Sequence, residues 1–220
     1  MSTFAQALTE WDRAAFVAIN SGLRSPLLDC TMPAITDLGL GHVQALIALS
    51  FALALGIRAS EVRSDAPWRA GWLALRAQRA WLGPLLMAYL MTLVVVTAIK
   101  TIPRDRPWWF YLHEHRVGRH LDVKVHTVEG VRPIRVRGFP SGHTAATAAM
   151  AMVFTLTVGR HRGRVVWAWV AVAVIGFSRI YLADHWPLDV LGGAAVGVAM
   201  GYLAVKIYRW KLLEGQGQKE

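Results

Sequence analysis

The sequence has almost no cysteine, few acidic residues, and several long stretches with no charge at all. Its single cysteine, Cys30, excludes a disulfide within the chain, and we expect a small buried side chain there. The first ten residues lack the basic start and apolar core of a cleavable signal peptide, so internal segments are expected to direct membrane insertion. Neither a repeat nor a linker interrupts the chain, which predicts a single domain over residues 1–220.

Hydrophobic and basic residues are what the sequence has in excess. Hydrophobic residues make up 55% of it, the mean hydropathy is +0.36 and the formal charge is +10. Uncharged apolar runs of about 20 residues indicate membrane spans, because a helix of that length crosses ~30 Å of hydrocarbon. Ten tryptophans fit an aromatic belt at the membrane surface. A soluble nucleic-acid binder would explain the charge but not the apolar runs, so no nucleic-acid partner is expected.

Five apolar segments predict an all-α, polytopic membrane helix bundle. The expected spans are residues 40–57, 80–99, 141–158, 165–182 and 188–205. The segment 26–57 is too long for one crossing and too short for two, so its part before residue 40 is expected to lie in or dip into the interface. Glycines at 193, 197 and 201 are four residues apart, a spacing that lets a neighbouring helix approach closely.

The segments outside these spans are expected at the membrane surface. In the N-terminal region 1–39, apolar residues recur at helical spacing and predict an interfacial amphipathic helix: Phe4, Leu8, Trp11, Ala15 and Ile19. Residues 58–79 are interpreted as a polar loop, and the polar C-terminal tail as frayed. In the long loop 103–139, apolar and polar residues alternate on both sides of Glu129-Gly130, which predicts a small extramembrane β-hairpin.

The predicted hairpin carries four basic residues, Lys124, Arg132, Arg135 and Arg137. Two interpretations stay open for them. They form a solvated surface that attracts anionic lipid heads, or they fold over the site described below and contact a second anionic group of a substrate.

Three short motifs place ionisable residues at the ends of the predicted spans. They are Lys100 to Arg106-Pro107, Pro140-Ser141-Gly142-His143, and Ser178-Arg179 through His185 to Asp189. Five crossings put all three on one membrane face. The positive-inside rule makes the opposite face cytoplasmic, because it carries the arginine-rich segment 58–79 and the basic tail. The sequence therefore predicts a multi-pass membrane protein whose motifs face the periplasm or exterior.

The residue types in these motifs suit chemistry on a phosphate ester. Lys100, Arg106 and Arg179 are cations that can neutralise a phosphate, and a helix that starts at Ser141-Gly142 offers free backbone N–H groups to an anion. Asp189 follows His185 by four residues, so the carboxylate can accept from one imidazole nitrogen while the other attacks phosphorus. His143 has no such partner and can act as the general acid. With no carboxylate cluster suited to Mg²⁺, neither a metal nor another cofactor is expected.

Each motif taken alone has a structural explanation. Pro-Ser-Gly-His is most often a helix start, a basic residue at a span end is usually an interfacial anchor, and His-x-x-x-Asp is often a structural hydrogen bond. Metal binding by His143, His185 and Asp189 is a further alternative. The presence of all three motifs on one membrane face favours the functional interpretation.

At these residues the chain resembles the type 2 phosphatidic acid phosphatase (PAP2) family of membrane lipid phosphatases, which is related to vanadium haloperoxidases and glucose-6-phosphatase. The second motif of that family is present at Pro140–His143, and the third, Ser-Arg-x5-His-x3-Asp, at Ser178–Asp189. The first motif departs from the family, because five residues and not six separate Lys100 from Arg106. Either the turn at Pro103 is tighter, or Arg104 shares the role of binding phosphate.

The resemblance covers residues 80–205 and implies a metal-independent phosphatase with a phosphohistidine intermediate. By that analogy His185 is the nucleophile, Asp189 orients it, and His143 protonates the leaving group. The implied phosphate-binding residues are Lys100, Arg106, Ser141, Gly142 and Arg179.

Several substrates and two other functions fit this resemblance. The expected substrates are undecaprenyl diphosphate, phosphatidylglycerol phosphate, phosphatidic acid or the 1-phosphate of lipid A. A lipid phosphotransferase with the same intermediate is the alternative function. A non-catalytic lipid-binding or transport protein is a third, which the complete set of histidines disfavours.

Overall fold

The computed structural model describes residues 3–59, 67–116, 123–131, 135, 137–157 and 162–217. Over these ranges the regular elements are all helices: α1 (Thr3–Asn20), α2 (Pro26–Asp37), α3 (Gly41–Ala59), α4 (Pro67–Ala77), α5 (Arg79–Ile99), α6 (Pro107–Arg116), α7 (Gly142–Thr157), α8 (Arg162–Tyr181) and α9 (Pro187–Gly217). The all-α prediction is confirmed for this part of the chain.

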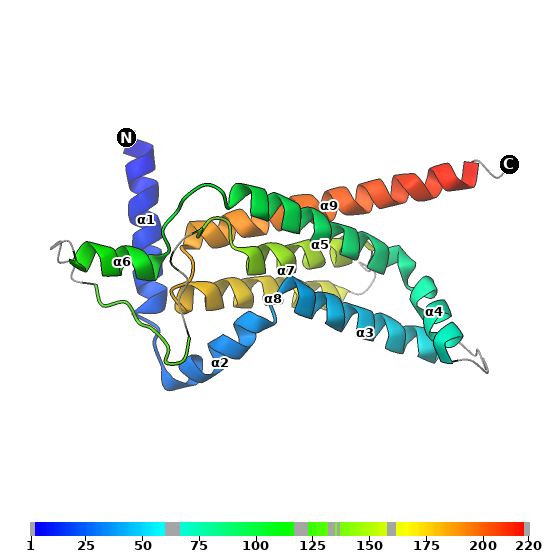
Figure 1. The fold of residues 1–220 in the computed structure, drawn as a ribbon, viewed down its shortest axis with the longest axis horizontal. Helices are drawn as coiled ribbons and strands as arrows, with labels where there is room; N and C mark the ends of the chain where they lie inside the picture. Colours follow the sequence, from blue (N-terminus) through cyan, green and yellow to red (C-terminus); the bar gives the residue numbers. More distant parts are fainter. Residues whose placement is uncertain are drawn as a thin grey trace.

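The helix α7 lies at the centre of a bundle whose long axis is horizontal in Figure 1. It packs against α9, α5, α8 and α3. Its buried side chains are mostly alanine, including Ala145, Ala148 and Ala149. Because these side chains are short, the neighbouring helices approach the α7 backbone closely.

The closest approach is made by the glycines of α9, as the spacing in the sequence predicted. A Cβ atom added to Gly193 or Gly197 would collide with the carbonyl oxygen of Ser141 or Ala145. One added to Gly201 would lie 2.7 Å from the carbonyl oxygen of Ala149. This contact holds α9 in register against α7.

Three described helices are long and apolar enough to cross a membrane: Arg79–Ile99, Gly163–Tyr181 and Pro187–Lys211. A fourth candidate is the pair α2 and α3, which passes only as one broken span bent by 71°. The expectation of five spans is therefore not confirmed, because α7 has 16 residues and is short for a crossing. The sharp bend does agree with the predicted dip before residue 40.

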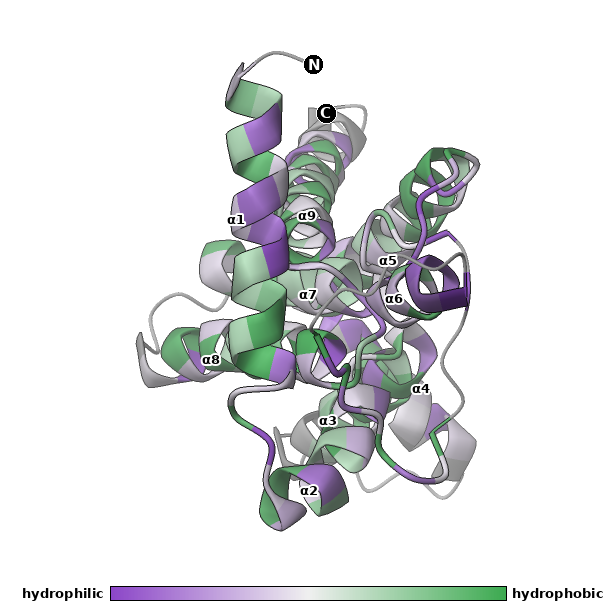
Figure 2. Cartoon of the chain, turned by 90° about the vertical axis from the view of Figure 1, so that its left-hand side faces the viewer, coloured by the Kyte–Doolittle hydropathy of each residue, from purple (hydrophilic) through white to green (hydrophobic). Residues whose placement is uncertain are grey.

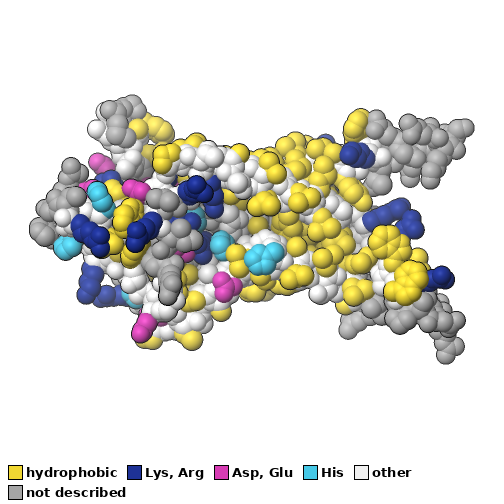
Figure 3. Space-filling view, viewed as in Figure 1, with side chains coloured by type: hydrophobic (Ala, Val, Ile, Leu, Met, Phe, Trp, Pro, Cys, Tyr) yellow, Lys and Arg dark blue, Asp and Glu magenta, His cyan; other side chains and the backbone are white. Residues whose placement is uncertain are grey.

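On the face drawn in Figure 3, hydrophobic side chains dominate the middle of the bundle, whereas Lys and Arg gather toward its two ends. The helix α1 lies across one end of the bundle (Figures 1 and 2). Phe4, Leu8 and Trp11 are exposed on it, while Asp12 and Phe16 are buried against the protein. This arrangement fits the expected interfacial helix, whose apolar face meets the membrane surface.

Four local expectations were wrong. The segment 58–79 contains α4, and the loop 103–139 contains α6. These helices are only 11 and 10 residues long, so each extends over only about three turns, too few for a clear helical pattern in the sequence. The helix α9 continues through the polar tail to Gly217 and does not fray before that residue. Cys30 is exposed on α2 and not buried.

The expected β-hairpin is not found among residues 123–131, 135 and 137–138, none of which is in a strand. Arg132, Ile134 and Val136 of that prediction lie outside the described residues. The backbone of His126 pairs with the side chain of Asn20 and not with a second strand. The Asn20 amide accepts from the backbone N–H of His126 (2.8 Å) and donates to the backbone carbonyl of His126 (2.9 Å). Val123 and Val125 pack on an aromatic cluster, so the alternation reflects burial on one side only.

Candidate active site

The third motif spans the turn that joins α8 to α9. Arg179 lies in the last turn of α8 and Pro187 begins α9, so His185 lies between the two helices and Asp189 in the first turn of α9. His185 and Asp189 are 1% and 0% exposed. The backbone N–H of Trp186 donates to Oδ2 of Asp189 at 3.0 Å, which caps α9 with the carboxylate.

The same carboxylate faces the ring of His185. Its Oδ2 lies 3.5 Å from Nδ1, longer than the ~2.7–2.9 Å of a charge-assisted hydrogen bond. Nδ1 therefore points toward Asp189, and Nε2 is the nitrogen left for a substrate. Burial, and after it the charges of Arg179, Arg106 and Lys100, lowers the pKa of His185 well below its ordinary 6.5. The ring is thus neutral at pH 7, the form that can act as a nucleophile.

The second motif starts α7 at the same end of the bundle. The hydroxyl of Ser141 accepts a hydrogen bond from the backbone N–H of Thr144 at 3.5 Å. The backbone N–H of Ser141 donates to the backbone carbonyl of Asp189 at 2.9 Å. That bond ties the start of α7 to the start of α9. His143 follows in the first turn, within electrostatic range of His185, Lys100, Arg106 and Arg179.

The first motif contributes its lysine to the same place. Lys100 follows α5, and its ammonium nitrogen lies 3.6 Å from the point where a Cβ on Gly142 would stand. Burial, followed by the charges of Arg106 and Arg179, lowers the pKa of Lys100. The three motifs therefore converge, and the shorter spacing of the first motif does not keep Lys100 away.

Asp184 is a member of this cluster that the sequence reasoning missed. Its Oδ2 lies 2.6 Å from Nη2 of Arg179, and its Oδ1 lies 3.3 Å from Nη1 of Arg106. A second residue, Thr36 of α2, accepts from Nη1 of Arg179 at 2.7 Å. Nε of Arg179 is buried and has no hydrogen-bond partner. One carboxylate thus holds both guanidinium groups side by side, while one donor stays available to an anion.

The side chain of Arg104 does not lie where the shortened spacing between Lys100 and Arg106 suggested, which was at the phosphate. Its Nη2 lies 2.7 Å from Oδ2 of Asp12, and its Nε lies 3.0 Å from Oδ1 of Asp189. Asp12 also accepts from the backbone N–H of Leu188 at 2.8 Å. Burial raises the pKa of Asp12, while that N–H and the charge of Arg104 lower it. The geometry favours a positioning role for Arg104, linking α1 to the carboxylate beside His185, over contact with phosphate.

We expect Asp12→Ala to lower kcat about ten-fold, because it removes both the Arg104 pair and the bond to the first turn of α9. Asp12→Asn, whose single amide oxygen can still accept one of the two bonds, should lose less. Glu10→Ala is the matched control, since Glu10 is exposed on the same helix. Steady-state kinetics in detergent would measure the effect. Equal kcat values for Asp12→Ala and Glu10→Ala would show that Asp12 does not act on the site.

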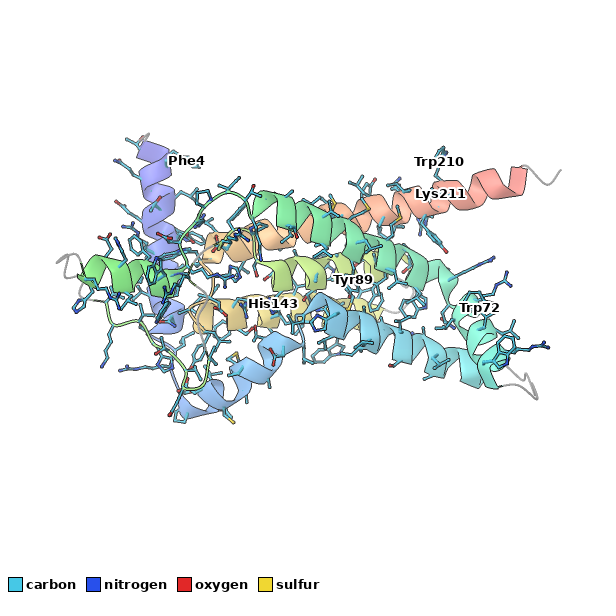
Figure 4. The ribbon with its side chains drawn as sticks, viewed as in Figure 1. Phe4, Trp72, Tyr89, His143, Trp210 and Lys211 are labelled. Carbon is cyan, nitrogen blue, oxygen red and sulfur yellow. The ribbon has the colours of Figure 1, made fainter. Side chains whose placement is uncertain are left out.

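A groove of about 670 Å³ leads from the site between α3, α5 and α7. Lys100, Gly142 and His143 line one end, and Tyr89 and Leu86 line the other. Figure 4 shows His143 near one end of the bundle and Tyr89 farther along it. Most of the lining is apolar, so the groove can hold a hydrocarbon chain whose polar end lies at His143.

Within the described ranges, no group of three or more His, Cys, Asp or Glu side chains is placed to hold an ion. The alternative in which His143, His185 and Asp189 ligate a metal therefore has no geometric support.

Comparison with known proteins yields a consistent set of relatives. Residues 81–213 match the family model of the PAP2 superfamily. The chain is 37% identical over 84 residues to a lipid A 4'-phosphatase of Porphyromonas gingivalis, covering 38% of this chain and 35% of the relative. It is 32% identical over 73 residues to an undecaprenyl-diphosphatase of Sulfolobus acidocaldarius, and this match covers 31% of this chain and 32% of the relative. The chain thus matches about a third of the length of each relative.

The fold also has a counterpart among solved structures. The crystal structure of Aquifex aeolicus LpxE is similar with a TM-score of 0.64 and 27% sequence identity, over 88% of this chain and 93% of that one. The family match covers more than half of the chain and includes all three converging motifs. The protein therefore belongs to the PAP2 superfamily.

Proposed function

We propose that this protein is a lipid phosphatase that hydrolyses a phosphomonoester or diphosphate on a membrane lipid through a phosphohistidine intermediate. The observation that carries the proposal is the convergence of the buried His185–Asp189 pair, His143 and three cations at the end of an apolar groove. A phosphate held there has its lipid chain in the groove and its phosphorus at His185.

In the first half of the reaction, Nε2 of His185 attacks phosphorus and forms a P–N bond. The bond from phosphorus to the lipid oxygen breaks. Burial and the nearby cations lower the pKa of His143 to about 3, so His143 takes up a proton when the bound phosphate offsets these positive charges, and it donates this proton to the lipid oxygen. Arg106 and Arg179 neutralise the charge on the transferred phosphoryl group, and Lys100 adds a third positive charge. Asp189 stabilises the ring of His185 as it becomes positively charged.

In the second half, a water molecule takes the place of the departed lipid alcohol. His143, now neutral, accepts a proton from this water as it attacks phosphorus. The P–N bond breaks, inorganic phosphate leaves, and His185 returns to its neutral form. Transfer to a lipid hydroxyl in place of water gives the phosphotransferase alternative with the same residues.

The location proposed for this chemistry is the periplasmic or exterior face of a bacterial inner membrane. The three motifs lie at one end of the bundle, while α4 and the end of α9 lie at the other (Figure 1). These two helices carry Arg69, Arg76, Lys206 and Arg209. Under the positive-inside rule, that end faces the cytoplasm.

Phosphate release by the purified protein from a panel of lipid phosphates tests the proposal. The panel contains undecaprenyl diphosphate, phosphatidylglycerol phosphate, phosphatidic acid and lipid A. Release of inorganic phosphate from at least one lipid is expected. Radiolabel appearing on a second lipid instead would support the phosphotransferase, and no turnover of any lipid would support the binding or transport protein.

Activity is expected to survive chelation within about two-fold, because Lys100, Arg106 and Arg179 can supply the positive charge that Mg²⁺ supplies elsewhere. Assays with excess EDTA, with and without added Mg²⁺, would measure this. Vanadate should inhibit, since it can adopt the five-coordinate geometry of the phosphorus under attack. Activity that EDTA abolishes and a divalent ion restores would contradict the metal-independent mechanism.

A further inference from the structure

The start of α3 lies directly beside the general acid His143. A break at residues 38–40 separates α2 from α3, and glycines on each side of Leu40 bring the backbone close to α7. A Cβ on Gly39 would lie 3.0 Å from Cβ of His143, and one on Gly41 would lie 3.6 Å from Cβ of Ala146. The first turn of α3 therefore forms the wall of the groove next to the point where the leaving group departs.

This wall offers hydrogen-bond donors. The backbone N–H groups of the first turn of a helix have no carbonyl within their own helix to bond, and the helix dipole makes that end attractive to anions. His42, in this turn, is exposed and lines the groove. Lys100 lines the same groove, and no acidic side chain is among its described lining residues. The charge of this part of the groove therefore suits an anion.

Thr92 of α5, which lines the same groove, has an unpaired hydroxyl. Other helical threonines, such as Thr147 and Thr155 of α7, donate to the carbonyl four residues earlier, at 2.8 and 2.7 Å. The Thr92 hydroxyl has no hydrogen-bond partner, although the residue is only 3% exposed and lines the groove. A buried hydroxyl without a partner is costly, so a bound group that pairs with it would gain affinity.

We propose that the first turn of α3, His42 and Thr92 form a subsite for a second phosphate, the one that stays on the lipid when a lipid diphosphate is cleaved. This inference rests on the proposed function. If the terminal phosphorus lies at His185 and the bridging oxygen at His143, the remaining phosphate lies next along the groove, beside Gly41 and His42. A lipid monophosphate places an uncharged carbon there instead.

The subsite assists the first step of the reaction. When the terminal phosphoryl group moves to His185, the bridging oxygen keeps the electron pair of the broken bond and takes a proton from His143. The departing lipid monophosphate gains negative charge during this step. Donors that already face it stabilise that charge more in the transition state than in the ground state.

The test compares farnesyl diphosphate with farnesyl monophosphate, which share one hydrocarbon chain. For His42→Gln and Thr92→Val, we expect the ratio of kcat/KM on the diphosphate to kcat/KM on the monophosphate to fall about ten-fold, the usual effect of losing a hydrogen bond to a charged group. His113→Gln and Thr31→Val are the matched controls. His113 is exposed, Thr31 is half-buried, and neither lines the groove. Equal losses on the two substrates would overturn the subsite.

Two further outcomes separate the subsite from the proposed function. A wild-type protein that cleaves lipid monophosphates but not farnesyl diphosphate would refute the subsite alone. A protein that releases no phosphate from any lipid would refute the function on which the subsite rests. If Thr92→Val disturbs packing in α5, the exposed His42 carries the test, because its replacement leaves no cavity in the bundle.

Discussion

His185→Ala is expected to abolish turnover, lowering kcat by at least about four orders of magnitude, because the proposed reaction has no other nucleophile. The protein should stay folded in detergent, since the ring lies in the turn between α8 and α9 and outside the helix contacts of the core. His185→Asn is the companion variant that fills most of the space. Phosphate release from the best lipid of the panel measures the loss. A variant with more than a hundredth of wild-type activity would exclude His185 as the nucleophile.

The covalent intermediate can be observed directly. Wild-type protein quenched during turnover of a ³²P-labelled lipid should carry acid-labile label at His185, and His185→Ala should carry none. Label on a serine or on His143 would refute the assignment. His143→Gln provides a control for the acid: it should impair lipid turnover more than turnover of p-nitrophenyl phosphate, whose leaving group needs little protonation.

The residues of the three motifs could be predicted from the sequence because each motif is local. A short spacing such as that of His185 and Asp189 fixes which side chains share a turn, and span ends place the motifs on one face. The glycine spacing of α9 was informative for the same reason, since residues four apart share one helix face. What these patterns report is geometry within a single helix or turn.

Contacts between distant segments could not be predicted in this way. Arg104 meets Asp12 across 92 residues, and Arg179 meets Thr36 across 143. In the sequence, Asp12 is only a polar residue on an amphipathic helix. Asp184 gave a local signal in the sequence, because a carboxylate next to His185 and close after Arg179 must be paired if it is buried.

The packing of α7 against α9 leads to a second large effect, this time on stability. Gly197→Val is expected to shorten the half-life of the folded protein in detergent at least ten-fold, because its Cβ would collide with the carbonyl oxygen of Ala145. A backbone carbonyl cannot relieve the clash by changing rotamer as a flexible side chain can, so the two helices must separate. Overpacking of this kind typically costs about 1–3 kcal/mol, and more where backbone must move.

The same separation should damage the site, because the two helices carry its parts. Ser141 and His143 begin α7, Asp189 lies in the first turn of α9, and the Ser141–Asp189 backbone bond of 2.9 Å joins them. Gly163→Ala is the matched control, since a Cβ at that glycine of α8 meets nothing within 4 Å. Thermal inactivation at several temperatures, together with kcat of the surviving fraction, would measure both effects. If Gly197→Val were as stable and active as Gly163→Ala, the close contact between α7 and α9 would not be what aligns His143 with His185.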